Sequence, residues 1–551
     1  MYVTFVLKKP TKTLFMAKTT ITPIGQWNTF HDNGPYPTRL LLDTALEKKS
    51  VLPQSLDRYR DAASEIQRLL QDTLDHNERF RAFGSGWSLN DIAHQQDRMH
   101  FNARMNLKWS IAVSDLHQKS TLDAGNLFFF QCGNIIKEAS AFLHQYGKSF
   151  RTTGASNGQT IGGAVSTGIH GSSLDVGAFQ DAVRGINLII GPGPHDNVYI
   201  EKHTQPVLND THIANLGARV IRNDGLFLAA LVGLGGFGFI HGVVIETEPL
   251  FLLKRYTRHI KRPAALQLAH SLDFSDPAVF SIPGEMDASG TCNRPFHYMI
   301  YVNPYNKKED YITEVMYKKP YRTGYPDPIP RICNAVYKDL PDWMAAFAAK
   351  HNKLIPLIMK AMTETIFPTL DDEAEGTLPE IFWDSQHAGP AFCISMGIDH
   401  RDAGAALDLF IQVVNKYGPV PGAIGMRFVR STEATLGFTR FPYTCMLEMD
   451  GILWTGNPQM ISLPDLEARL WEAMRKEGIP FTMHWGKNSA WHVPGLIDYM
   501  YGNKDGEWKE YRSALLGKQM ADVFSNNFLQ RCRLAEFRTH TASKLTESIL
   551  V

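Results

Sequence analysis

Two short segments rich in glycine and hydroxyl side chains could hold a phosphate group. Residues 81–91 read RAFGSGWSLND, and residues 153–173 read TGASNGQTIGGAVSTGIHGSS. Glycine lets the backbone approach a ligand closely, and successive N–H groups form concavities suited to a diphosphate. Because Ile161, Val165 and Ile169 are interleaved in the second segment, we predict an ordered phosphate cradle rather than a flexible linker.

A third glycine-rich segment, GLGGFG at residues 233–238, matches the dinucleotide-binding pattern G-x-G-x-x-G. That pattern needs a preceding strand, a following helix and an acidic residue about 20 positions later. Here the glycines follow a helix-like run and lead into a strand-like one, and TRHIKR stands where the acid should be. We therefore reject an NAD-type site.

The composition is that of a soluble globular enzyme. The 551 residues favour two or three domains. Lys+Arg and Asp+Glu number 56 each, and no dense basic run occurs, so we predict no nucleic-acid partner. Residues 226–245 carry no formal charge, but their five glycines and His241 favour a buried helix that turns into a buried strand, not a membrane span.

Six scattered cysteines form no C-x-x-C pair, which argues against a metal site or a disulfide framework and favours a cytoplasmic location. The N-terminus lacks the pattern of a secretory signal, and either Met1 or Met16 could be the natural start.

The elements are expected in two groups. A helix from Pro53 that Ser55 can cap, a strand over 79–83, and alternating strands and helices up to residue 250 indicate an α/β or α+β domain, preceded by an irregular segment. We adopt the α+β class for the whole chain. The second group is predicted to be a sheet with helices on one face. Its expected helices span 402–417 and 464–477, and its expected strands span 424–430 and 443–450.

Two segments of the second group allow more than one interpretation. Residues 342–366 are apolar and should be divided at Pro356; they are either core or a flexible wall of a site for a large apolar substrate. Residues 371–376, DDEAEG, are predicted to be a solvated linker.

RAFGSGWSLND, followed by SNGQTIGGAVSTGIHGSS, resembles the vanillyl-alcohol-oxidase-type (PCMH-type) FAD-linked oxidases, nearest the aldonolactone and alditol oxidase branch. HWGK at 484–487 and DVFSNNFL at 522–529 are similar to further segments of that branch. The resemblance implies four regions: an N-terminal extension (1–45), an FAD-binding domain (46–250), a substrate-binding cap of antiparallel sheet and helices (251–495), and a C-terminal segment (496–551) that returns to the FAD domain.

The resemblance also implies which residues bind FAD. They are Arg81, Gly84, Ser85, Gly86, Trp87, Ser88, Ser156, Thr160, Ile161, Gly162, Gly163, Ser166, Thr167, Gly168, His170, Gly171, Gly238, Ile240 and Lys487. In many relatives a histidine at the position of Trp87 is bonded covalently to the flavin. Tryptophan has no comparable nucleophile, so we predict that FAD is bound without a covalent link.

The same resemblance places catalytic residues on the cap. Arg427 matches the arginine of a Glu-x-Arg pair, whereas Gly425 replaces the glutamate, and Glu448 is a candidate to supply the missing acid. Lys487 could stabilise the reduced flavin, and His484 could take a hydroxyl proton, with His492 as a further candidate base. No metal is expected.

These observations predict an FAD-dependent oxidase or dehydrogenase that removes a hydride from a CH–OH carbon of a sugar lactone or polyol. Oxygen or another acceptor would reoxidise the flavin. An oxidase of a larger lipophilic alcohol such as a sterol is the alternative, and a non-catalytic flavin-binding protein is the alternative of another class. The sequence has no feature that fixes the oligomeric state.

Overall fold

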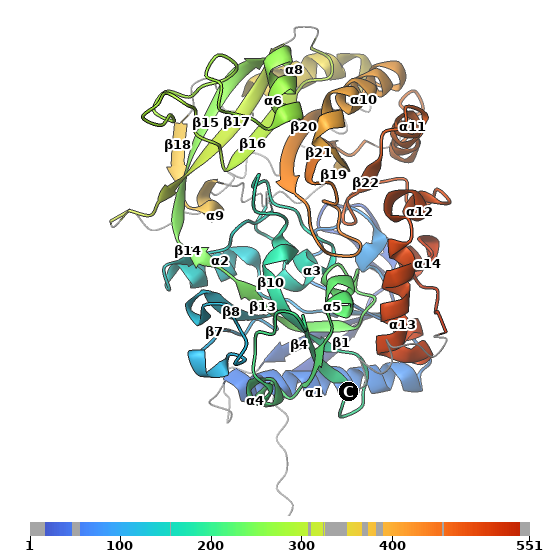
Figure 1. The fold of residues 1–551 in the computed structure, drawn as a ribbon. Coiled ribbons are helices and arrows are strands. Elements are labelled where there is room, and N and C mark those ends of the chain that lie inside the picture. Colours follow the sequence, from blue (N-terminus) through green and yellow to red (C-terminus); the bar gives the residue numbers. More distant parts are fainter. Residues whose placement is uncertain are drawn as a thin grey trace, which may run out of the picture.

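The computed structural model describes residues 17–46, 55–154, 156–306, 310–322, 324–325, 350–365, 373–381, 390–454 and 457–539. Figure 1 shows two stacked domains, a lower one built mainly from the first half of the chain and an upper one built around a single large sheet. The predicted α+β class, with an antiparallel sheet in the second domain, is confirmed. Met1, Met16 and residues 342–349 and 371–372 lie outside the described residues.

The first domain contains a four-stranded and a six-stranded sheet. The first has the order β1 (Ala17–Pro23), β4 (Leu40–Leu46), β6 (Arg98–Phe101), β5 (Phe80–Phe83). The second has the order β12 (Arg219–Arg222), β11 (Asn197–Glu201), β10 (Val183–Ile189), β13 (Phe239–Glu246), β8 (Leu127–Gln131), β7 (Lys108–Ser110). Two small ladders join β2 (Gln26–Trp27) to β3 (Tyr36–Pro37) and β9 (Lys148–Ser149) to β14 (Glu248–Pro249). The expectation that the first 50 residues are irregular is wrong for β1 and β4, because both pair into the four-stranded sheet.

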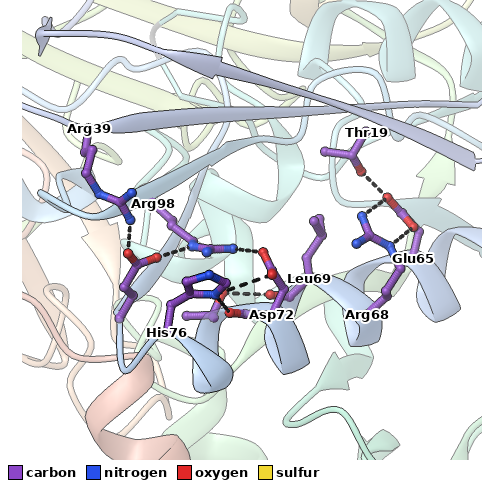
Figure 2. Close-up of polar contacts among 10 residues, drawn as sticks. Thr19, Arg39, Glu65, Arg68, Leu69, Asp72, His76 and Arg98 are labelled. Atoms are coloured by element: carbon purple, nitrogen blue, oxygen red, sulfur yellow. Dashed lines mark hydrogen bonds and ion pairs between the residues drawn. The ribbon is translucent and has the colours of Figure 1, made fainter.

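Helix α1 (Ser55–Asp75) lies along the base of the first domain, where ion pairs fasten it to the four-stranded sheet (Figure 2). Arg98 of β6 is buried and pairs with both Asp72 and Glu78. Glu65 accepts hydrogen bonds from Thr19 of β1 and from Arg68, the latter at 2.8 Å. A buried arginine bound by two carboxylates fixes the position of β6, which pairs with β5, the strand that precedes the first glycine-rich loop. The other helices of this domain are α2 (Ile136–His144), α3 (Ile161–Ser166), α4 (Asp210–Asn215) and α5 (Asp224–Leu231).

The uncharged stretch at 226–245 is a helix followed by a strand, as predicted. Most of it lies in α5, whose leucines and alanines are largely buried, and in β13 at the centre of the six-stranded sheet. The glycines of GLGGFG form the turn between them, so this segment is core. In the part of the chain that the structure describes, we find no helix that is both long and apolar enough to span a membrane.

The second domain is an eight-stranded sheet in which every pairing is antiparallel. Its order is β18 (Glu373–Gly376), β15 (Phe251–Lys261), β17 (Asp310–Pro320), β16 (His297–Val302), β20 (Gly422–Arg430), β21 (Tyr443–Ile452), β19 (Ala391–Asp399), β22 (Phe481–Met483). Its helices are α6 (Arg262–Ser271), α8 (Ile355–Thr365), α9 (Leu378–Ile381), α10 (Ala403–Tyr417) and α11 (Leu463–Lys476). Helices α6 and α10 cover the outer face, away from the first domain (Figure 1).

Two expectations for this domain differ from the structure: the linker at residues 371–376 and the division of a helix at Pro356. Residues 373–376 are not a solvated linker, because they form β18 and pair with β15. Pro356 lies at the beginning of α8, so it marks the start of a helix, as its missing N–H allows.

The C-terminal helices α12 (Leu496–Tyr501), α13 (Lys504–Val523) and α14 (Asn527–Arg531) run down the side of the molecule to the first domain (Figure 1). The Trp508 indole donates to the Val232 carbonyl at 3.2 Å, and Arg512 donates to the Gly236 carbonyl at 2.8 Å. The Asn526 amide donates to the carbonyls of Ile92 and His94. The C-terminal helices and the loop between α13 and α14 thus pack against GLGGFG and against the segment that follows RAFGSGW.

Candidate FAD and substrate site

A cavity of about 350 Å³ lies between the two domains. The predicted FAD residues that line it are Arg81, Gly84, Ser85, Gly86, Trp87, Ser88, Ser156, Thr160, Gly162, Gly163, Ser166, Thr167, His170, Gly238, Ile240 and Lys487. The predicted Ile161, Gly168 and Gly171 do not line it; Ile161, the first residue of α3, is fully buried in the core. Arg427 and His484 also line the cavity, so the candidate cofactor and catalytic residues share one space.

The two glycine-rich loops touch each other at one wall of this cavity. A Cβ atom on Gly84 would lie 1.8 Å from the hydroxyl oxygen of Thr160, which no side chain could tolerate. Glycine at this position therefore allows the first loop to pack directly on the second. The two loops therefore meet at one wall of the cavity, as a diphosphate cradle requires.

Buried polar atoms at this wall fit an anionic cofactor. The Arg81 side chain is buried, and its Nη2 atom donates to the carbonyls of Ile92 and Leu234. Among the described residues its Nη1 atom has no hydrogen-bond partner. Burial, with a smaller contribution from Arg512, lowers the pKa of Arg81 to about 9. A diphosphate would compensate this buried charge.

Trp87 is held in a narrow slot. One face of its indole stacks on Phe30 with ring centres 4.6 Å apart, and His31 meets it edge-on at 5.3 Å. A Cβ atom on Gly158 would lie 2.3 Å from the Trp87 ring, so this glycine also approaches the indole closely. The Phe30 N–H also donates to the Gly86 carbonyl, so the segment before α1 braces the first glycine-rich loop.

The HWGK segment docks directly on the first glycine-rich loop. The Leu89 N–H donates to the Gly486 carbonyl at 2.8 Å, and the Asn90 amide donates to the carbonyls of Trp485 and Lys487. The Asn488 amide donates back to the Leu89 carbonyl. Two segments that are almost 400 positions apart in the sequence therefore form one interlocked unit.

The upper wall of the cavity carries a buried cluster of charges centred on Glu448. Arg427 donates to Glu448 through Nε at 2.8 Å and through Nη2, and its Nη1 donates to the Ser172 hydroxyl at 3.0 Å. Lys487 pairs with the other carboxylate oxygen of Glu448, and the Nε2 atom of His170 lies 3.4 Å from that oxygen. Gly425 lies directly opposite Glu448 in the β20–β21 register. The carboxylate that pairs with Arg427 thus comes from the neighbouring strand.

The charges of this cluster fix its protonation. Burial opposes ionisation of Glu448, but Arg427 and Lys487 hold its pKa well below its ordinary value. Burial would lower the pKa of Lys487, but Cys393, Glu448 and Asp450 raise it. Burial and the charge of Arg427 lower the pKa of His170 to about 4. At neutral pH the cluster therefore contains one carboxylate, two cations and a neutral imidazole.

The tautomer of His484 follows from its contacts. Burial lowers its pKa well below the ordinary value, with His170 and Lys487 acting in the same direction, so the ring is neutral. Its Nδ1 atom accepts a hydrogen bond from the Gly486 N–H at 3.1 Å. The proton therefore resides on Nε2, which makes His484 a hydrogen-bond donor at neutral pH rather than a base.

Three cavity residues with useful chemistry were missed by the sequence analysis: His31, Cys393 and Asp450. Cys393 and Asp450 face each other across β19 and β21, a pairing that no local motif reveals. The candidate base His492, by contrast, is exposed and does not line the cavity. In the described part of the chain, no group of His, Cys, Asp and Glu side chains could hold a metal ion.

Comparison with known proteins agrees with this geometry. Residues 60–194 match a family described as an FAD binding domain. A Neurospora crassa protein that carries the name D-arabinono-1,4-lactone oxidase is 24% identical over 211 residues, which are 38% of this chain and 31% of the relative. A D-arabinono-1,4-lactone oxidase of Candida glabrata is 26% identical over 142 residues, which are 26% of this chain and 23% of the relative. The matched regions thus span under a third of each relative.

The fold is similar to solved structures over almost the whole chain. Cholesterol oxidase from B. sterolicum has a TM-score of 0.65 at 12% identity, covering 96% of this chain and 100% of that protein. A solvent-stable cholesterol oxidase has a TM-score of 0.64, with the same identity and coverage. Residues 60–194 are therefore similar to an FAD binding domain, within a two-domain fold like that of the cholesterol oxidases.

Proposed function

We propose that this chain is an FAD-dependent oxidoreductase that oxidises the CH–OH group of a polar small molecule of the sugar lactone or polyol type. The observation that carries this proposal is the single cavity that joins the two glycine-rich loops to the cluster of Arg427, Glu448 and Lys487. The names of the two sequence relatives support the lactone class. Dioxygen or another acceptor would then receive the electrons.

The residues of the upper wall bind and orient the substrate. FAD, when bound, supplies the acceptor for the hydride that leaves the CH–OH carbon. Arg427 and Lys487 present fixed positive charges to the oxygen atoms of the substrate, and Glu448 holds both cations in place. The Nε2–H group of His484 can donate to the oxygen that becomes the carbonyl.

Two other functions remain as alternatives. The similarity in fold to cholesterol oxidases keeps a sterol substrate under consideration, but Arg427, Asp450 and Lys487 on the upper wall would have to be covered by an apolar molecule at high cost. A non-catalytic flavin carrier would need the two loops without the Arg427–Glu448–Lys487 cluster.

The decisive experiment is anaerobic reduction of the purified yellow protein. D-arabinono-1,4-lactone, sorbitol and cholesterol are added separately while the flavin absorbance near 450 nm is recorded. Bleaching by the lactone or the polyol supports the proposal, and bleaching by cholesterol alone selects the sterol alternative. If none of a broader panel of alcohols bleaches the flavin, the carrier is favoured.

We further propose that FAD is held without a covalent link, since Trp87 occupies the position where many relatives have the linking histidine. After acid precipitation, the yellow colour should be released into the supernatant. A yellow pellet would contradict the proposal. In that case His31, which lines the cavity beside Trp87, is the first residue to replace.

A cytoplasmic location is also part of the proposal. The five cysteines within the described residues are free and buried, as expected in a reducing compartment.

A further inference from the structure

Asp450 is the carboxylate of the upper wall that opens into the cavity. It lies two residues after Glu448 on β21, so both side chains project from the same face of the strand. Glu448 is 0% exposed and fully engaged with its partners, whereas Asp450 lies deep in the molecule but keeps its surface open to the cavity that it lines. One face of one strand therefore provides a structural carboxylate and, beside it, an accessible one.

Ionisable groups from four other segments surround Asp450. Cys393 lies opposite it on β19 and hydrogen-bonds to it, Tyr301 approaches from β16, Arg427 from β20, and Lys487 from the loop after β22. Burial and the neighbouring charge of Glu448 raise the pKa of Asp450, while Lys487 opposes this increase. The result is a carboxylate with increased basicity that remains accessible to a ligand.

The other polar groups of the cluster are poorly suited to accept a proton. Arg427 and Lys487 are cations, and Glu448 is engaged by three partners. His484 presents Nε2–H. His170 donates through Nδ1 to the Gly171 carbonyl, and its Nε2 faces Glu448.

We propose that Asp450 binds a hydroxyl group of the substrate and accepts its proton during oxidation of the CH–OH carbon. The inference rests on the proposed function, which supplies FAD as the oxidant. The C–H bond breaks, and its hydrogen and electron pair leave as a hydride for the flavin. The O–H bond breaks, its proton passes to Asp450, and its electron pair forms the second bond of the carbonyl.

This arrangement also specifies the substrate class. Arg427, Lys487 and His484 are donors, and Asp450 is an acceptor on the same wall. A ligand that satisfies them needs several oxygen atoms and at least one hydroxyl donor. A polyhydroxylated compound such as a polyol or a hydroxylated lactone meets this requirement, whereas a sterol with one hydroxyl group does not.

The test compares Asp450→Asn and Asp450→Glu with the wild-type holoenzyme and with Glu477→Gln, a control at an exposed position outside the site. Flavin reduction by D-arabinono-1,4-lactone and by sorbitol is followed anaerobically by stopped flow. With the compound that reduces the wild type, D450N should be slowed about 10²- to 10⁴-fold at neutral pH. D450E should recover part of the rate, and all variants should retain FAD.

The pH profile separates a base from a residue that is merely structural. In the wild type and E477Q, the reduction rate should fall as the pH falls through the pKa of Asp450; in D450N this dependence should disappear. A D450N rate within threefold of the wild type, with an unchanged pH profile, would overturn the role of Asp450 while leaving the proposed function intact.

A second measurement needs no substrate. The visible spectrum of the bound flavin is titrated between pH 4 and 9, since a nearby carboxylate that gains a proton changes the local field. A change of the flavin spectrum with pH that occurs in the wild type and in E477Q but not in D450N supports an ionisable Asp450 at the flavin. If no probe reduces the wild type, the proposed function fails and the proton transfer fails with it. If D450N retains this spectral change, Asp450 is not the group that titrates there, and the inference fails separately.

Discussion

The two walls of the cavity differ in the chemical groups that form them. The lower wall consists of glycine-rich loops whose backbone groups come from two continuous segments, with Arg81 as its buried charge. The upper wall consists of charged side chains that neighbouring strands bring together, with Glu448 at the centre. A wall made mainly of backbone groups suits a cofactor that stays bound, whereas a wall of side chains can orient a small substrate. The comparison predicts that changes to one wall leave the function of the other largely intact.

The largest effect is expected when the upper wall loses its central carboxylate. Glu448→Ala leaves Arg427 and Lys487 buried without their partner, so the free energy of unfolding should fall by about 3–5 kcal/mol. Denaturant unfolding measures this change. The exposed Glu477→Ala should change it by less than about 0.5 kcal/mol. A loss below 1 kcal/mol in E448A would mean that the cluster does not depend on Glu448.

The contribution of Glu448 to the free energy of unfolding should decrease as the pH falls. The pKa of Glu448 is held well below its ordinary value in the folded protein, mainly by Arg427 and Lys487 against the effect of burial. Its stabilising contribution is therefore fully present above the unfolded-state pKa of about 4.3 and is lost as the pH falls toward the folded-state pKa. The difference in unfolding free energy between wild type and Glu448→Gln should be constant from pH 7 to 5 and should narrow below about pH 4.3. A difference that widens on acidification would contradict this protonation scheme.

The lower wall should respond to the loss of Arg81. Arg81→Met removes the buried cation that we assign to the diphosphate, so the affinity of the apoprotein for FAD should fall by about 1.5–3 kcal/mol, roughly ten- to a hundredfold. Titration of FAD fluorescence measures the dissociation constant. Arg60→Met, which removes an exposed surface arginine, is the control. The rate of flavin reduction in protein saturated with FAD should change little; a large decrease in that rate would show that the two walls are not independent.

The difference between the walls also explains what could be predicted from the sequence. The lower wall is encoded in contiguous segments, so RAFGSGW and the loop at 153–173 were recognisable as a phosphate cradle from their glycine content. Their assignment to FAD, and that of Gly238 and Ile240, came from the family resemblance. HWGK was recognisable as a motif, but its docking on Leu89 and Asn90 was not, because the contact joins backbone atoms almost 400 positions apart.

The upper wall depends on strand register, which the sequence does not specify. Glu448 was a candidate partner for the position of Gly425, and the β20–β21 pairing places the two directly opposite each other. Asp450 was missed because its role depends on the pairing with Cys393 and on its position at the cavity. The strands β1 and β4 were missed for a related reason: β4 is stabilised by its parallel pairing with β6, a long-range contact.

The smallest effect is expected at the slot around Trp87. Phe30→Leu removes the aromatic stack on the indole but keeps an apolar side chain. The free energy of unfolding should therefore fall by about 0.5–1.5 kcal/mol. Tyr146→Leu is a matched control, since Tyr146 makes comparable contacts with Phe128 and Phe142 away from the cavity. Both variants should lose similar stability in denaturant unfolding, but only F30L should release FAD faster on dilution and gel filtration. Equal FAD release from both would mean that Phe30 contributes only to general packing, and that the position of Trp87 is set by Gly158 and the rest of the loop.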